Sequence, residues 1–226
     1  MTLRKAGGLA ALTCAASYVF GFALLVTVLA PLGFGTNEID SAAVAAFIAE
    51  RPGVLIAWNT VIYVVNALAL VVLVVTLRQQ IARSRPDAAA VTGAIGLVWA
   101  TLVLGAGMIA NVAVERTHAL ADDPVAAASL WQTLHAVELG LGGGNEIAGG
   151  AWILVVSLAG RASGILGRVP SGIGALCGFA GLATILPPLG ETAGAVFGLG
   201  AIAWFVSVGL VLLRQGQTSF AKEISA

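Results

Sequence analysis

Six long apolar stretches occupy most of this 226-residue chain. The hydrocarbon core of a bilayer is about 30 Å thick, and a helix needs about 20 apolar residues to cross it. Each stretch has about that length, so the sequence predicts an all-α polytopic membrane helix bundle that forms a single integral membrane domain over residues 1–226. The six predicted transmembrane helices cover residues 8–32, 54–77, 89–114, 139–160, 169–189 and 192–213.

The charges of this chain are few, balanced and unevenly placed. Charged residues make up 10 % of the sequence and the formal net charge is zero, which gives no reason to expect a nucleic-acid partner. In a six-span arrangement, only the basic residues Arg51 and Arg116 fall on the side that carries most of the acidic residues. The other side carries both termini and most of the basic residues, so the positive-inside rule places both termini in the cytoplasm. The other nine are Arg4, Lys5, Arg78, Arg83, Arg85, Arg161, Arg168, Arg214 and Lys222.

Two short helices are predicted on the outer face, around residues 41–50 and 124–138. Asp40 or Ser41 can cap the first helix, because both side chains accept hydrogen bonds from free backbone N–H groups. Asp123 can cap the second, and Pro124 suits its first position. Each helix carries one apolar stripe, typical of a helix that lies at the membrane interface.

Glycines mark a predicted bend and two predicted packing faces. Four glycines fall within residues 140–144, where a helix that continued from residue 123 to residue 160 would be too long for one span. The pairs Gly174/Gly178 and Gly194/Gly198 have the small-xxx-small spacing that lets helices approach closely. We expect this packing within the chain, with homo- or hetero-oligomerisation as the alternative.

Polar residues inside the predicted spans are candidates for function, because each costs roughly 2.5–3.5 kcal/mol on insertion scales if charged. They concentrate in the outer half of the bundle, where they can converge on one outward-facing cavity. The alternative for the asparagines is hydrogen bonding between helices. The predicted ligand-binding residues are Asn59, Tyr63, Asn66, Asn111 and Glu146.

Glu146 stands out among them because it lies between the glycine break and an apolar run. If the carboxyl group is buried, desolvation favours its neutral form, which can donate a hydrogen bond or a proton. Alternatively, Glu146 lies at headgroup level and caps the fourth span. The candidate catalytic residues are Glu146, Glu138 and His135, the last two being three residues apart on one helical face.

A metal site is weakly indicated by two pairs of carboxylate and imidazole. Glu115 and His118 form one pair, although His118 is expected in a loop, and His135 and Glu138 form the other. Di-metal helix bundles use Glu-x-x-His pairs together with further carboxylates. With two histidines in the chain we predict no metal site and no cofactor. No serine-hydrolase or phosphate-loop motif is present in the sequence.

Two segments carry a family resemblance. The sequence AERPGV at residues 49–54 leads into an apolar helix, and GGAWILVVSLAGRASG at residues 149–164 is followed by Arg168-Val169-Pro170. Together they resemble a bacterial family of six-span membrane proteins, the domain of unknown function four-three-eight-six. The resemblance implies the six-span architecture and a bacterial inner (cytoplasmic) membrane. It implies no activity, because none is established for that family.

Three classes of function fit the sequence, which does not decide whether the protein is an enzyme. The first is binding or movement of a small apolar or amphiphilic molecule, such as a lipid or isoprenoid, in the outer cavity. The second is intramembrane acid–base chemistry on a lipid or isoprenoid, which needs a second titratable group near Glu146. The third is an accessory subunit that packs through its glycine faces, in which case Glu146→Gln is silent.

Overall fold

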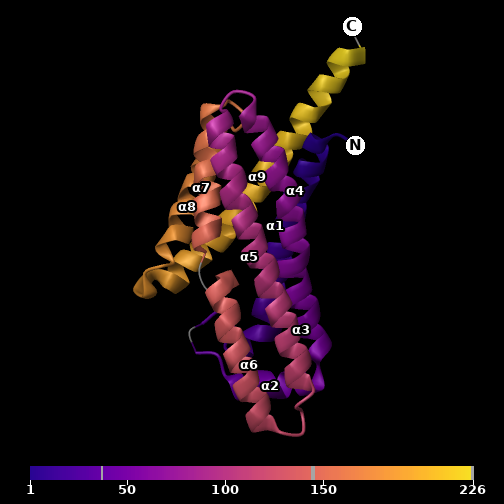
Figure 1. Ribbon diagram of the computed structural model, residues 1–226, viewed down its shortest axis with the longest axis vertical. Helices are drawn as coiled ribbons and strands as arrows, with labels where there is room; N and C mark the ends of the chain where they lie inside the picture. Colours follow the sequence, from indigo (N-terminus) through magenta and orange to yellow (C-terminus); the bar gives the residue numbers. More distant parts are fainter. Residues whose placement is uncertain (37, 144–145, 225–226) are drawn as a thin grey trace. The chain divides into compact units, whose positions relative to one another are not determined.

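The protein is described from a computed structural model that covers residues 1–36, 38–143 and 146–224, with the side chains of residues 143 and 215–224 left aside. No strand occurs among these described residues, so the all-α prediction is confirmed for them (Figure 1). The helices are α1 (Leu3–Leu24), α2 (Ser41–Glu50), α3 (Pro52–Asn59), α4 (Asn66–Ala82), α5 (Pro86–His118), α6 (Pro124–Glu138), α7 (Ile147–Ala162), α8 (Arg168–Ala183) and α9 (Gly190–Ile224).

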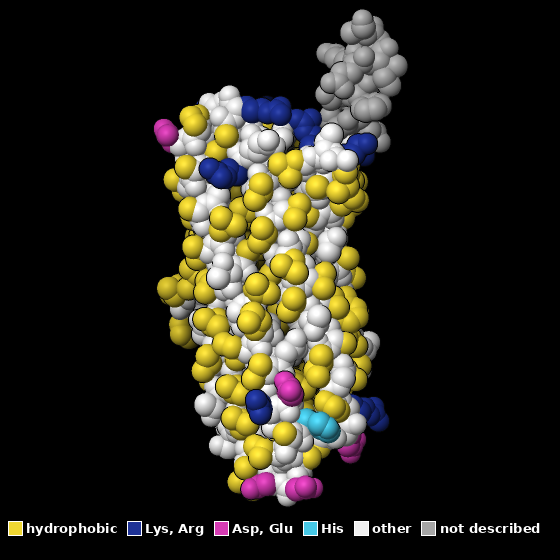
Figure 2. Space-filling model, turned by 45° about the vertical axis from the view of Figure 1, so that its right-hand side comes forward, with side chains coloured by type: hydrophobic (Ala, Val, Ile, Leu, Met, Phe, Trp, Pro, Cys, Tyr) yellow, Lys and Arg dark blue, Asp and Glu magenta, His cyan; other side chains and the backbone are white. Residues whose placement is uncertain are grey.

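Five helical stretches of the described chain are long and apolar enough to cross a membrane. Large apolar side chains cover much of the face drawn in Figure 2, as expected for helices that face lipid. The predicted fifth span, at residues 169–189, corresponds to α8, whose 16 residues give about 24 Å of helix. Six spans and a cytoplasmic position for both termini therefore stay predictions. The five stretches are Leu3–Leu32, Pro52–Ala82, Pro86–His118, Pro124–Ala162 and Pro187–Arg214.

The predicted glycine break interrupts the helix that follows Pro124. After α6 the backbone continues as the π-helical segment η4 (Leu139–Gly143), in which Gly142 has a φ of 132°. This value lies in the region that favours glycine, because a Cβ atom would clash with the backbone. The helix therefore stops before α7 begins. Gly144, which belonged to the predicted break, lies outside the described residues.

The chain forms two compact units. Unit 1 contains Met1–Ala16, Leu68–Ala100 and Glu146–Ala226, and unit 2 contains Ser17–Ala67 and Thr101–Asn145. Because α1 and α5 each supply residues to both, the units are not separate domains in sequence.

Unit 1 is held together by close packing of α7, α8 and α9 and by buried tryptophans. A Cβ atom on Gly150 would lie 2.8 Å from the carbonyl oxygen of Gly178, so the backbones of α7 and α8 approach closely. The indole N–H of Trp152 donates to the carbonyl of Thr92 at 3.0 Å, and that of Trp204 donates to Ser157 Oγ at 3.0 Å. Both large rings are thus buried without an unpaired donor.

The two predicted glycine faces differ in their surroundings. Gly174 and Gly178 pack inside unit 1, against Ser157 and Trp204 and against Leu154 respectively. By contrast, nothing lies within 4 Å of a Cβ atom placed on Gly194. Oligomerisation through Gly194 and Gly198 stays a prediction.

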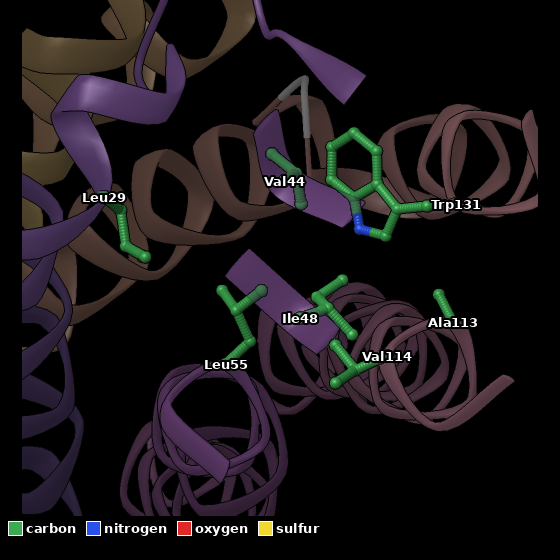
Figure 3. Close-up of a cluster of buried hydrophobic side chains, with 7 residues drawn as sticks. All are labelled: Leu29, Val44, Ile48, Leu55, Ala113, Val114 and Trp131. Carbon is green, nitrogen blue, oxygen red and sulfur yellow. The ribbon is translucent and has the colours of Figure 1, made fainter. Parts of the chain in front are cut away.

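Unit 2 contains both predicted short helices, and their caps form as expected. Asp40 accepts hydrogen bonds from the backbone N–H groups of Ala42 and Ala43, and Asp123 accepts one from Ala126. The helices α2 and α6 pack against each other around a buried cluster that also contains residues of the longer helices (Figure 3). This cluster comprises Leu29, Val44, Ile48, Leu55, Ala113, Val114 and Trp131.

Candidate functional site

The most concentrated polar contacts of unit 2 join α6 to the helix that contains Tyr63. The Tyr63 hydroxyl donates to Glu138 Oε1 at 2.6 Å, and His135 Nδ1 lies 2.8 Å from Glu138 Oε2. Both oxygens of the carboxylate are therefore engaged. We call these three residues the polar triad. Its acidic member is deeply buried, with 5 % of the Glu138 side chain exposed, and 17 % of the His135 side chain is exposed.

The local structure explains why these side chains meet. His135 and Glu138 are three residues apart near the end of α6, so they lie on one face. Tyr63 lies in a π-helical segment, η3 (Thr60–Val65), which separates α3 from α4. Such segments turn side chains relative to a regular helix and occur frequently at functional sites. A Cβ atom on Gly107 of α5 would collide with Tyr63, so this glycine makes room for the tyrosine.

His135 is held in place by aromatic rings as well as by Glu138. Its imidazole stacks on Trp131, with ring centroids 4.6 Å apart and an angle of 16° between the planes. The ring centroids of Phe34 and His135 are 6.2 Å apart. Phe34 also packs edge-on against Trp131 and Trp58. Stacking and a hydrogen bond at Nδ1 together fix both the position and the orientation of the imidazole.

The second ring nitrogen of His135 is the unusual feature of this arrangement. Nε2 is buried and has no hydrogen-bond partner among the described residues. Native proteins pair the large majority of buried polar atoms, and leaving one unpaired costs about 1–3 kcal/mol. An oriented imidazole with one free nitrogen can accept a hydrogen bond, bind a metal ion or transfer a proton.

Asn111 is a second polar residue of unit 2 with one engaged atom and one unpaired atom. Its amide Nδ2 donates to Thr60 Oγ1 at 3.1 Å, while Oδ1 is buried without a partner in the described chain. Thr60 and Tyr63 are three residues apart on η3. This segment therefore contacts Asn111 and also supplies one member of the polar triad. The predicted hydrogen bonding between helices is thus confirmed for Asn111.

The other predicted ligand-binding residues have separate surroundings. Asn59 and Asn66 are buried in unit 2, on either side of η3, the π-helical segment that contains Tyr63. Glu146 belongs to unit 1 and is half-buried at the start of α7. Its backbone N–H donates to Thr184 Oγ1 at 3.0 Å, but its carboxylate makes no capping hydrogen bond with α7.

The described residues contain no cluster of three or more metal-ligating side chains. Glu115 and His118 are both exposed near the end of α5, whereas His135 and Glu138 are partly or fully buried on α6. The expectation that His118 lies in a loop is wrong, because it is the last residue of α5. Glu138 pairs with Tyr63 rather than with a further carboxylate. Tyr63, Glu138 and His135 therefore form a hydrogen-bonded chain.

Sequence reasoning missed three contributors to this site, namely Thr60, Phe34 and the π-helical turn of η3. The available signal was the spacing of Thr60 and Tyr63, which places a hydroxyl and a phenol on one helical face. No protein-family model matches the chain, and no curated protein or solved structure is similar enough to match it either. Membership of the six-span family therefore stays a prediction.

Proposed function

We propose that this membrane protein binds a small amphiphilic molecule whose polar group hydrogen-bonds to His135 Nε2. The observation that supports the proposal is the unpaired, buried Nε2 of an imidazole whose other nitrogen is held by Glu138. A ligand that pairs this atom removes an unfavourable free energy of about 1–3 kcal/mol. The unpaired Oδ1 of Asn111 offers a further acceptor in the same unit.

The chemistry of these atoms narrows the ligand. Glu138 already accepts hydrogen bonds from the Tyr63 hydroxyl and from Nδ1–H of His135. A neutral imidazole held in this way has its lone pair on Nε2. The acceptor Nε2 favours a polar group that donates a hydrogen bond, such as the hydroxyl of a lipid or isoprenoid alcohol. The apolar rings of Trp131 and Phe34 beside the imidazole suit the hydrocarbon part of such a molecule.

Native mass spectrometry of the protein released gently from its own membrane tests this function. We expect the wild-type protein to carry a stoichiometric adduct and His135→Phe, which keeps an aromatic ring but lacks Nε2, to lose it. Tyr63→Phe is the matched control, because it also removes one donor from Glu138 but leaves Nε2 in place. His118→Phe controls for loss of an exposed histidine. Phospholipid adducts are recognised by their masses and are not counted. A wild-type protein without any other adduct, or the same adduct retained by His135→Phe, would contradict the proposal.

A second function is favoured by the geometry of His135 and Glu138. A carboxylate that holds Nδ1 while Nε2 stays free is the arrangement in which histidine serves as a general base. In that case the bound molecule is a substrate and the enzyme converts it. The same spectra separate the two functions, because an enzyme would also release a product whose mass matches no lipid of the starting membrane.

A further inference from the structure

The described basic residues of unit 1 gather at one end of that unit. Arg4 Nη2 donates to Gln80 Oε1 at 2.7 Å, which joins the start of α1 to the end of α4. A Cβ atom on Gly8 would lie 2.7 Å from Leu213 Cγ, so the start of α1 also meets the part of α9 next to Arg214. Several Lys and Arg side chains lie close together near one end of the face drawn in Figure 2.

Two turns at this end contact each other directly. Arg85, in the turn between α4 and α5, donates its Nε–H to the carbonyl of Ala162 at the end of α7, with 3.2 Å between the heavy atoms. Ile81, Ala89 and Ala159 form a small buried cluster beneath the two turns. The contact brings together four exposed arginines, which we call the arginine patch: Arg83, Arg85, Arg161 and Arg168.

Among the described residues, no ion pair joins an arginine of the patch to an acidic side chain. Asp87, in the first turn of α5, is the acidic residue closest in sequence to these arginines. The first turn of α8 contains no acid, and its capping residue, Gly167, offers no side-chain cap. Free N–H groups at a helix start add a partial positive charge next to Arg168.

We propose that the arginine patch binds the phosphate of an anionic phospholipid from the surrounding bilayer. Arginine pairs with phosphate through two parallel hydrogen bonds, and basic pockets between membrane helices recognise lipid headgroups. The patch has the depth of a headgroup, because Arg161 lies in the last turn of α7 and Arg85 immediately precedes α5, both at ends of apolar helices. This site is in unit 1 and is independent of the function proposed for the polar triad.

Lipid titration of the purified protein in a neutral detergent, followed by native mass spectrometry, tests the proposal with phosphatidylglycerol and phosphatidylcholine. We expect phosphatidylglycerol to be retained and phosphatidylcholine not. Each arginine removed should weaken binding about five-fold, so that Arg161→Gln with Arg168→Gln weakens it about 25-fold. This double variant leaves the bond from Arg85 to Ala162 in place.

The control is Arg51→Gln with Arg116→Gln, which removes two exposed arginines of unit 2 and should leave phosphatidylglycerol binding unchanged. Replacing Arg161 and Arg168 by lysine should restore part of the binding, because the charge is kept but the two parallel hydrogen bonds are lost. Equal retention of the two lipids, equal loss in both double variants, or displacement of the lipid by the same concentration of inorganic phosphate would overturn the proposal.

Discussion

Replacement of Gly150 by alanine is expected to lower the free energy of unfolding by about 3 kcal/mol, the upper end of the usual cost of overpacking. The added Cβ would lie 2.8 Å from Gly178 O and from Leu182 N. Both are backbone atoms, so no rotamer change can relieve the clash and α7 must move away from α8. Unfolding in sodium dodecyl sulfate, followed by tryptophan fluorescence, measures the effect.

Gly172→Ala is the matched control for this substitution. Gly172 lies on α8, and nothing is found within 4 Å of a Cβ atom placed there. Alanine is favoured over glycine inside a helix by about 1 kcal/mol, so this variant should be as stable as the wild type or slightly more stable. If Gly150→Ala and Gly172→Ala unfold at the same detergent concentration, the backbones of α7 and α8 do not approach closely at Gly150.

Replacement of Glu138 by alanine is expected to destabilise the protein by about 2–5 kcal/mol, because two buried donors lose their acceptor. These donors are the Tyr63 hydroxyl and His135 Nδ1. Glu138→Gln should be intermediate, since its amide oxygen can serve one donor while its amide nitrogen faces the other. The same unfolding titration provides the measurement.

Glu115→Ala is the control for the loss of a carboxylate, because Glu115 is exposed on α5. Its free energy of unfolding should lie within about 0.5 kcal/mol of the wild-type value. A Glu138→Ala variant as stable as Glu115→Ala would show that the polar triad does not form in the folded protein.

Much of the fold could be predicted because the relevant signals are local in sequence. The caps at Asp40 and Asp123 and the helix break at Gly142 each depend on residues a few positions apart. Span length is likewise a local property, and five of the six predicted spans lie within the five long apolar helical stretches. The stretch at residues 169–189 is predicted as one span. The helix within it ends at Ala183, before two prolines that the apolar pattern includes.

The sequence predicts which residues belong to the site but not which of them contact each other. Tyr63, His135 and Glu138 are each candidates in the sequence, yet the sequence indicates no partner for Tyr63. Its actual partner, Glu138, lies 75 residues further along the chain. This contact depends on how η3 and α6 pack and on the π-helical turn of η3, and neither feature has a periodic signature in the sequence.

The most direct test of the central claim is nitrogen-15 NMR of histidine in the full-length protein, in detergent micelles, before and after removal of co-purified lipid. The chain has two histidines, so the spectrum of His118→Gln assigns His135. We predict that Nδ1 of His135 stays protonated and hydrogen-bonded in both states, while the Nε2 resonance shifts when the lipid is removed. An Nε2 resonance identical in both states, or an unprotonated Nδ1, would contradict the proposed binding site.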